Sequence, residues 1–142
     1  MLYNCTTNPL SFIFDVKNGQ LGSSWHMRAI MNGIIEEIFI VLSKTAFKTN
    51  WDTSAAYLDY FYNELLLLSE DHRSSMLQDK KAGNHTEIDY FNGAVINLAR
   101  DYKIACPHNE ITYKMVKFIE QLKLDKLVKS TKIRHSGERL NP

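Results

Sequence analysis

Apolar residues recur along this chain at intervals of three and four positions, which is the spacing of one face of an α-helix. Runs in which apolar and polar residues strictly alternate, as they do in a half-buried strand, are hard to find. The clearest stripe consists of Met27, Ile30, Ile34, Ile38 and Val41. The pattern therefore predicts an all-α domain, a helical bundle of about six helices.

The first helix is expected to be disturbed at Pro9. Proline has no amide hydrogen, and its ring crowds the carbonyl four residues earlier, here that of Cys5. We expect the helix to kink or restart at that point. The Asn18-Gly19 pair and Gly22 are typical of a helix end, so we expect the helix to finish there.

The second helix is expected to begin at Ser23 or Ser24, whose hydroxyl can accept an amide, and to end near Ser43. Its second half, from Ile34 to Leu42, is apolar nearly all round apart from Glu36 and Glu37. A helix of this kind is either central in the domain or covered by another chain.

Four more helices are expected over about 53–69, 74–81, 86–102 and 107–122. Their stripes predict the residues that face the core. These are Leu58, Phe61, Leu65 and Leu68 in the first of the four, Ile88, Phe91, Val95, Leu98 and Tyr102 in the third, and Ile111, Met115, Phe118 and Leu122 in the last. Gly93 interrupts the third stripe, and a close approach of another backbone would explain it.

Composition indicates one globular domain, because the chain has 142 residues of which 44% are apolar. We divide it into a core over about residues 1–122 and a basic, mobile tail over 123–142. Lys and Arg number 17 against 16 Asp and Glu, so the chain has no overall field that would attract nucleic acid or an anionic membrane. The two cysteines, Cys5 and Cys106, are expected to be free thiols.

Several functional motifs are absent from the sequence. It contains no Gly-rich phosphate loop, no HExxH and no paired CxxC, and no predicted strand could hold a dinucleotide-binding turn. We expect no metal site and no dinucleotide bound by this chain alone. No leader or membrane-spanning run stands out, which predicts a cytoplasmic protein without a membrane or nucleic-acid partner. The basic residues after Gln121 could contact nucleic acid, but we favour the simpler interpretation that they form a solvated tail.

One stretch of the sequence is more specific than these general patterns. Residues 74–79 read SSMLQD, residues 86–93 read TEIDYFNG, and residues 106–109 read CPHN. Near the start, residues 4–10 read NCTTNPL and residues 18–21 read NGQL. Together these segments resemble the C-terminal domain of ketopantoate reductases (2-dehydropantoate 2-reductases), over about residues 1–122. That domain belongs to the helical class found in reductases similar to 6-phosphogluconate dehydrogenase.

The resemblance implies a functional context. In the family, an N-terminal Rossmann domain holds NADPH, and the helical domain closes over ketopantoate while a hydride passes to its ketone carbon. This sequence lacks that first domain. The family's catalytic lysine precedes the first asparagine by four positions, which would fall immediately before Met1. We therefore expect no catalytic residue and no activity in this chain by itself.

The resemblance also implies a set of substrate contacts. Asn4 and Asn8 share one helix face, so both amides could bind one substrate hydroxyl, although capping or core hydrogen bonds near Pro9 are the plain alternative. Asn18 could contact substrate, or it could be an ordinary left-handed cap. The hydroxyl of Ser75 and the amides of Met76, Leu77 and Gln78 could hold a carboxylate, or Ser75 could be a simple helix cap.

Glu87 is the one residue that the resemblance assigns to the cofactor. In the family it would lie near the nicotinamide ribose and the catalytic lysine. An acidic side chain in the first turn of a helix is also stabilised by the helix dipole, which could explain it without any function. We expect Asp79 and Asp89 in the same motifs to be structural.

Two classes of function remain open at this point. The chain is either the substrate-binding and dimerisation half of a 2-keto acid reductase, most simply one for ketopantoate, or a non-catalytic helical interaction module. In the first case its partners would be the 2-keto acid, a Rossmann domain in cis or in trans, and a second copy packed through helices.

Overall fold

The computed structural model describes residues 1–138. All of its regular secondary structure in that range is helical, which confirms the all-α prediction. Most of them are α-helices. In chain order the elements are α1 (Leu2–Phe14), α2 (Asn18–Gly22), α3 (Trp25–Ser43), α4 (Ser54–Tyr60), the π-helix η1 (Phe61–Leu65), α5 (Leu66–Leu68), α6 (Ser75–Ala82), the 3₁₀-helix η2 (Ile88–Tyr90), α7 (Asn92–Asp101) and α8 (Pro107–Glu138).

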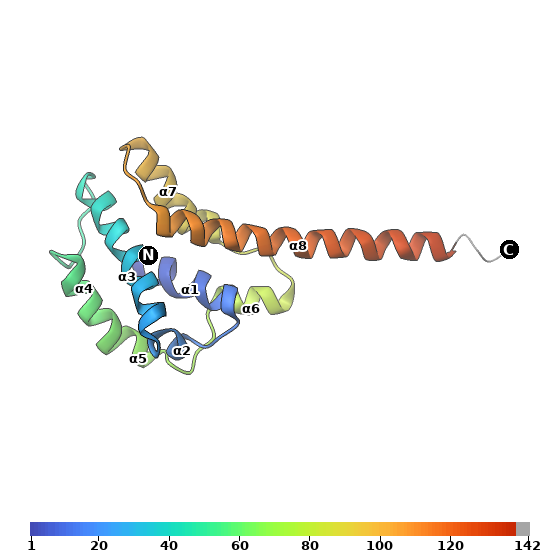
Figure 1. Ribbon diagram of the computed structural model, residues 1–142, viewed down its shortest axis with the longest axis horizontal. Coiled ribbons are helices and arrows are strands. Elements are labelled where there is room, and N and C mark those ends of the chain that lie inside the picture. Colours follow the sequence, from blue (N-terminus) through green and yellow to red (C-terminus); the bar gives the residue numbers. More distant parts are fainter. Residues whose placement is uncertain (139–142) are drawn as a thin grey trace.

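Helix α1 lies inside the body of the domain, where it packs against α2, α3, α6 and α8 (Figure 1). The segment from α4 to α5 covers the outer side of α3, and α7 packs on α8. The core between α1, α3 and α4 contains Cys5, Met31, Ile34, Ile35 and Phe61, all wholly buried. Helix α8 continues well beyond this body (Figure 1).

Helix α1 does not restart at Pro9, which was one of the two expected outcomes. Pro9 lies inside one continuous helix, and the carbonyl of Cys5, which loses its usual amide donor, accepts instead from Nδ2 of Asn92 at 2.9 Å. The helix ends at Phe14 because Asp15 adopts a left-handed conformation with φ of 53°. Asn18 therefore begins a separate helix, α2, where we expected it to end the first.

Glu37 of α3 caps the start of α8 with a buried carboxylate. Its Oε1 accepts from the backbone amide of His108 at 2.8 Å and lies 2.7 Å from Nδ1 of the same residue. Its Oε2 accepts from the backbone amide and from Nδ2 of Asn109, at 3.0 and 2.8 Å. The carboxylate thereby satisfies amides that a helix start leaves unpaired, at the end where negative charge is favoured.

Asn109 extends these contacts to α7 and α1. Its Oδ1 accepts from Nδ2 of Asn92 at 3.1 Å, and that same Nδ2 donates to Cys5 in α1. Asn92 and Asn109 are both wholly buried. Glu37, Asn109, Asn92 and the Cys5 carbonyl thus form one hydrogen-bonded chain through four helices, and we call it the Glu37 network.

The π-turn η1 changes which side of the α4 to α5 segment faces the core. Tyr57, Phe61 and Leu66 are buried, at spacings of four and then five residues, because the π-turn inserts one extra residue. Our predicted stripe is therefore wrong at its end, since Leu68 is 77% exposed. Thr53 caps α4 by accepting from the amide of Ala56 at 3.1 Å.

The predicted helix over 86–102 is divided, since only η2 and α7 are helical and they meet at Phe91. Tyr102, expected in the core, is 46% exposed. The close approach expected at Gly93 is confirmed. A Cβ at that position would lie 3.3 Å from the ring of Tyr113 and 3.4 Å from the carbonyl of Ile88.

Helix α8 buries a different face from the one that the sequence predicted. The residues expected in the core, Ile111, Met115, Phe118 and Leu122, are 42 to 63% exposed. The buried face consists of Asn109, Thr112 and Val116. The reason is the Glu37 network, because it draws the polar Asn109 inward and so sets the rotation of the helix about its axis.

The mobile tail expected over residues 123–142 is also corrected. Residues 123–138 continue α8 as helix, and the last four residues, including Arg139, lie outside the described part. Both cysteines are free and buried, as predicted, and burial raises the pKa of Cys5 to about 12. No helix within residues 1–138 has the length and apolar character needed to cross a bilayer.

We predict that Glu37→Ala lowers the free energy of unfolding by about 3 kcal/mol, because it leaves buried donors of His108 and Asn109 without an acceptor. The matched control is Glu36→Ala, which removes an exposed neighbour and should change stability by less than about 0.5 kcal/mol. Urea unfolding followed by circular dichroism measures both. Equal effects of the two substitutions would show that the network contributes nothing.

Candidate functional site

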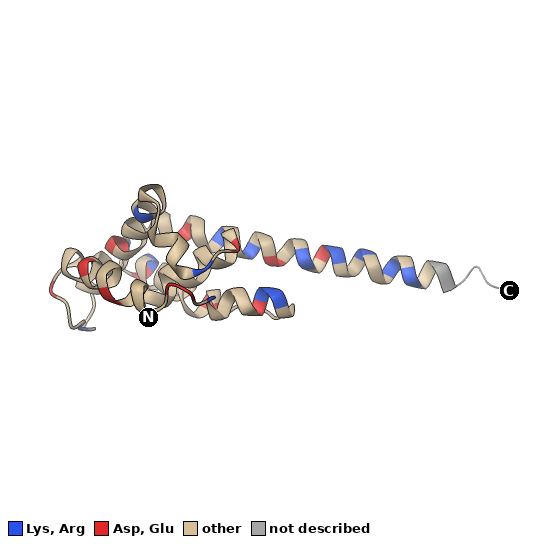
Figure 2. Cartoon of the chain, turned by 90° about the horizontal axis from the view of Figure 1, so that it is seen from below, with Lys and Arg blue, Asp and Glu red and all other residues tan. Residues whose placement is uncertain are grey.

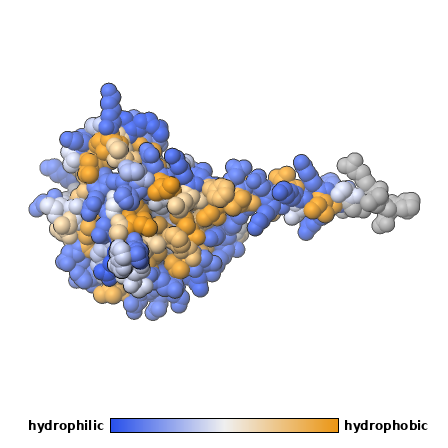
Figure 3. All heavy atoms as spheres, in the orientation of Figure 1, coloured by the Kyte–Doolittle hydropathy of each residue, from blue (hydrophilic) through white to orange (hydrophobic). Residues whose placement is uncertain are grey.

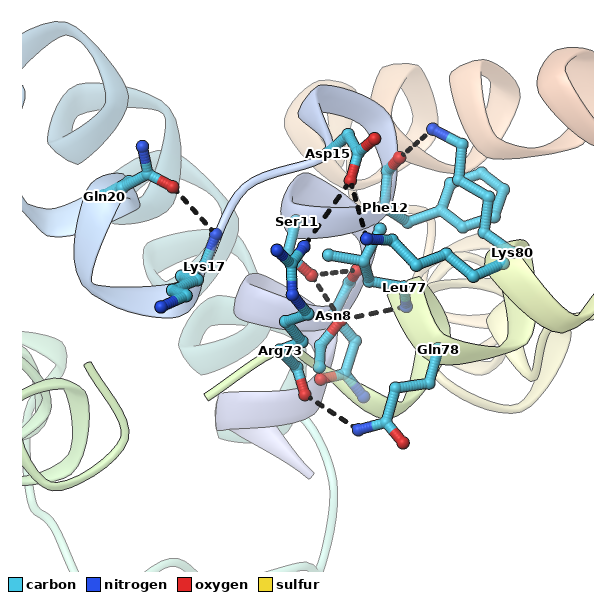
Figure 4. Close-up of polar contacts among 12 residues, drawn as sticks. Asn8, Ser11, Phe12, Asp15, Lys17, Gln20, Arg73, Leu77, Gln78 and Lys80 are labelled. Atoms are coloured by element: carbon cyan, nitrogen blue, oxygen red, sulfur yellow. Dashed lines mark hydrogen bonds and ion pairs between the residues drawn. The ribbon is translucent and has the colours of Figure 1, made fainter. Parts of the chain in front are cut away.

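The polar residues of α1 and α6 meet where the two helices cross. Nδ2 of Asn8 donates to Oγ of Ser75 at 3.5 Å. The hydroxyl of Ser11 hydrogen-bonds to that of Ser74 and donates to the Asn8 carbonyl at 3.0 Å (Figure 4). Asn8, Ser11 and Ser74 are buried, whereas Ser75 is exposed. This junction joins two of the residues predicted to contact substrate.

Ser74, and not Ser75, caps helix α6. Its Oγ accepts from the amide of Leu77 at 3.1 Å, and its carbonyl accepts from the amide of Gln78 at 3.0 Å. The amides of Leu77 and Gln78, which we expected to face an anion, are thus already paired. The amides of Ser75 and Met76 are the ones at this helix start that an α-helix leaves without an internal partner.

Basic side chains surround the end of α1 next to this junction. Arg73 and Lys81 lie 3.9 and 3.8 Å from the carboxylate of Asp15, and Nζ of Lys80 donates to the carbonyl of Phe12 at 2.6 Å (Figure 4). Nε2 of Gln78 donates to the backbone carbonyl of Arg73 at 3.1 Å. Three cations near one carboxylate give this region a positive character that favours an anionic ligand.

Asn18 is held inside the domain at the start of α2. Its backbone amide donates to the carbonyl of His72 at 3.0 Å, and its side-chain Nδ2 donates to the hydroxyl of Tyr3 at 3.0 Å. Tyr3 in turn hydrogen-bonds to Ser69. The side chain is 3% exposed, and its Oδ1 has no partner among the described residues.

Among the described residues, no side-chain hydrogen bond or ion pair joins Asn4 or Glu87 to the junction. Asn4 is half-buried one turn before Asn8, on the same face of α1. Glu87 is exposed and precedes η2, so it does not occupy the first turn of a long helix as we expected. The dipole of α7 therefore does not explain the presence of an acidic residue at this position.

The residues on either side of Glu87 are anchored to α8. The amide and hydroxyl of Thr86 both donate to Glu120, at 3.1 and 2.5 Å. Asp89 accepts from the hydroxyl of Tyr113 at 2.6 Å and from Nζ of Lys117 at 3.4 Å. These contacts agree with the structural role expected for Asp89. They attach the backbone on both sides of Glu87 to α8, while the carboxylate of Glu87 itself is exposed.

A more voluminous hollow lies elsewhere in the domain. It has a volume of about 480 Å³ and is bounded mainly by apolar side chains of α1, α3, α7 and the loop after α3, among them Ile38, Phe47, Trp51 and Leu98. Its lining also includes the polar side chains of Lys48, Thr49 and Asn50, but it contains none of the predicted site residues Asn4, Asn8, Asn18, Ser75 and Glu87. The α1–α6 junction is therefore the better candidate site.

Known proteins similar to this chain place it in a family. The family model described as "Ketopantoate reductase PanE/ApbA C terminal" matches residues 1–120. The 2-dehydropantoate 2-reductase of Aquifex aeolicus is 38% identical over 124 residues, which are 87% of this chain and 40% of that protein. The enzyme of the same name from Shigella flexneri is 39% identical over 114 residues, or 80% of this chain and 35% of that protein.

Solved structures agree with the sequence comparison. A PanE/ApbA family ketopantoate reductase from Ralstonia eutropha superposes with a TM-score of 0.77 at 27% identity, covering 87% of this chain and 40% of that one. A D-mandelate dehydrogenase solved with NADH and anilino(oxo)acetate gives a TM-score of 0.73 at 26% identity, covering 86% of this chain and 39% of that one.

The fold and the comparisons define the class as the helical C-terminal domain of an oxidoreductase. The chain belongs to the ketopantoate reductase family and corresponds to its C-terminal domain, as the shared motifs predicted. It spans about 40% of the length of the relatives it matches.

The described residues do not form a cofactor or metal site of their own. Residues 1–138 contain no strand and no Gly-rich turn that could hold a dinucleotide. No group of three or more metal-binding side chains occurs in the described part either.

Sequence reasoning missed Ser11, Ser74 and Glu37. A signal for Ser74 was present, because serine directly before a short amphipathic segment is a typical helix cap. No local signal marks Ser11 or Glu37, since their partners lie 63 and more than 70 residues away.

We predict that Ser74→Ala costs about 1 kcal/mol of stability, because it removes the cap of α6. Ser75→Ala is the matched control, and it should cost less than about 0.5 kcal/mol because Ser75 is exposed. Thermal unfolding of both variants tests this. A larger loss from Ser75→Ala than from Ser74→Ala would contradict the cap assignment.

The contact between Asp89 and Tyr113 predicts a dependence of stability on pH. The hydrogen bond from Tyr113 holds the pKa of Asp89 below its ordinary value of 3.8. A lowered folded-state pKa means that the contribution is complete above the unfolded value and is lost as the pH falls through the folded value. The stability difference between the wild type and Asp89→Asn should therefore shrink below pH 3.8. A difference that stays constant down to pH 2.5 or so would refute this.

Proposed function

We propose that this chain is the substrate-binding half of an NADPH-dependent reductase that converts a 2-keto acid, most simply ketopantoate, to the 2-hydroxy acid. In this proposal a separate Rossmann domain, in cis or in trans, binds the nucleotide and the helical domain holds the substrate. The chain by itself would then bind the acid weakly and would not turn it over.

The contact between Asn8 and Ser75 is the observation that carries the proposal. It joins two family motifs, NCTTNPL and SSMLQD, that are separated by more than sixty residues. The donors for a carboxylate and the oxygen atoms beside it are of two kinds. The side chains of Asn8 and Ser75 supply an amide and a hydroxyl, and the start of the eight-residue helix α6 supplies backbone amides. Arg73 next to the junction adds positive charge.

Asn4, Asn18 and Glu87 complete the proposed site. Asn4 continues the polar face of α1 by one turn, so its amide could share a substrate hydroxyl with Asn8. Asn18 retains one unpaired oxygen beside Tyr3. Glu87 lies between Thr86 and Asp89, which are both bonded to α8. Its exposed carboxylate would meet the ribose of the nucleotide in the complete enzyme.

Two alternatives differ from this proposal in substrate or in activity. The likeness to D-mandelate dehydrogenase favours a 2-keto acid with an aromatic substituent as the second candidate substrate. The exposed apolar stripe of Ile111, Met115, Phe118 and Leu122 on α8 would suit a non-catalytic interaction module.

We predict that a chimera restores activity. Residues 1–124 of this chain would replace the matching segment of the Aquifex aeolicus enzyme, whose own N-terminal part supplies the nucleotide site. The chimera should oxidise NADPH in the presence of ketopantoate, as followed by absorbance. Asn8→Ala or Ser75→Ala should each lower kcat/KM by about tenfold to a hundredfold, since each removes a hydrogen bond to a charged ligand.

Asn97→Ala, an exposed change on α7, is the matched control and should leave kcat/KM unaltered. If a folded chimera reduces an aromatic 2-keto acid but not ketopantoate, the proposed reaction stands and the proposed substrate is replaced by the aromatic acid. A folded chimera without activity on either acid would support the interaction module in place of the reductase.

A further inference from the structure

The outer part of α8 is a helix without a covering surface. The family match ends at residue 120, but α8 continues to Glu138 and extends beyond the body of the domain (Figure 1). Every side chain from Leu124 to Ser136 is exposed. We call residues 123–136 the α8 extension.

The α8 extension is amphipathic and strongly basic. Leu124, Leu127, Val128 and Thr131 recur at helical spacing and form one stripe. The three leucine and valine side chains are 47, 64 and 52% exposed. The rest of the circumference carries the exposed Ile133 and the basic residues Lys123, Lys126, Lys129, Lys132 and Arg134, against the single acidic residue Asp125. Figure 2 shows this concentration of basic residues, and Figure 3 shows apolar side chains among them.

The opposite end of the molecule carries the complementary charge. Residues 49–72, which include α4, η1 and α5, contain Asp52, Asp59, Glu64, Glu70 and Asp71 and no lysine or arginine. All five acidic side chains are exposed, and none forms an ion pair with a described residue. We call this surface the acidic α4–α5 face.

The acidic α4–α5 face also exposes apolar side chains. Leu67 and Leu68 are 59 and 77% exposed. Residues two positions after a buried one lie on nearly the opposite side of a helix, which places Asp59 and Leu68 outward, opposite Tyr57 and Leu66. Acidic and apolar groups therefore occur on one outer side, as a basic amphipathic helix would require.

We propose that the α8 extension of one copy of this chain docks on the acidic α4–α5 face of a second copy. The net charge of the whole chain is only +1, so two copies do not repel each other strongly, while their unlike ends attract. The apolar stripe of the extension packs on Leu67 and Leu68, and its lysines face the carboxylates. This interaction surface lies outside the proposed substrate site and does not depend on it.

Two charge reversals in the full chain test the pairing. Lys126→Glu/Lys129→Glu/Lys132→Glu reverses the charge of the extension, and Asp59→Lys/Glu64→Lys/Asp71→Lys reverses the charge of the acidic face. Sedimentation velocity should show concentration-dependent association of the wild type that weakens with salt. Each reversed protein alone should bind itself at least about tenfold more weakly, whereas an equimolar mixture of the two should associate as the wild type does.

Lys103→Glu/Lys114→Glu and Glu36→Lys are the matched controls, because they reverse exposed charges outside both surfaces and should leave association unchanged. A wild type that stays monomeric at all concentrations and at low salt would overturn the proposal. So would association that survives either reversal, or a mixture of the two reversed proteins that stays monomeric. Binding of a monomeric chain to anionic vesicles or to duplex DNA, lost in the lysine variant, would assign the extension to that other partner.

Discussion

The capping of α8 by Glu37 is the interaction on which the arrangement of this domain depends. A carboxylate buried among apolar side chains is costly unless every oxygen is hydrogen-bonded, and here each oxygen receives donors from the first turn of α8. The contact fixes both the position and the rotation of the longest helix. Asn109 and Asn92 extend it to the Cys5 carbonyl that Pro9 leaves free in α1.

This network explains why residues far apart in the family motifs occur together. The NPL segment creates an unpaired carbonyl, the NG pair supplies the amide that satisfies it, and the PHN segment positions that amide. The glycine after Asn92 leaves room for the ring of Tyr113 from α8. These motif residues serve the packing of α1, α7 and α8, and only the polar face of α1 toward α6 remains for a ligand.

The position of the proposed site follows from the same packing. Because α1 is held by α8 and α7 on one side, its polar residues Asn8 and Ser11 face the start of α6, where Ser74 and Ser75 lie. The capping role falls to Ser74, which leaves the hydroxyl of Ser75 exposed. One serine thus caps the helix start, and its neighbour remains accessible.

The sequence by itself determined the helical class, most helix boundaries and the family, because helical periodicity, caps and spaced motifs are local properties of the chain. It did not determine which side of a helix faces inward. The stripe from Ile111 to Leu122 is more apolar than the face that is buried, and the extra residue of η1 is invisible in the pattern. Those choices depended on contacts between residues more than seventy positions apart, such as Glu37 with Asn109, and only the tertiary structure brings such partners together.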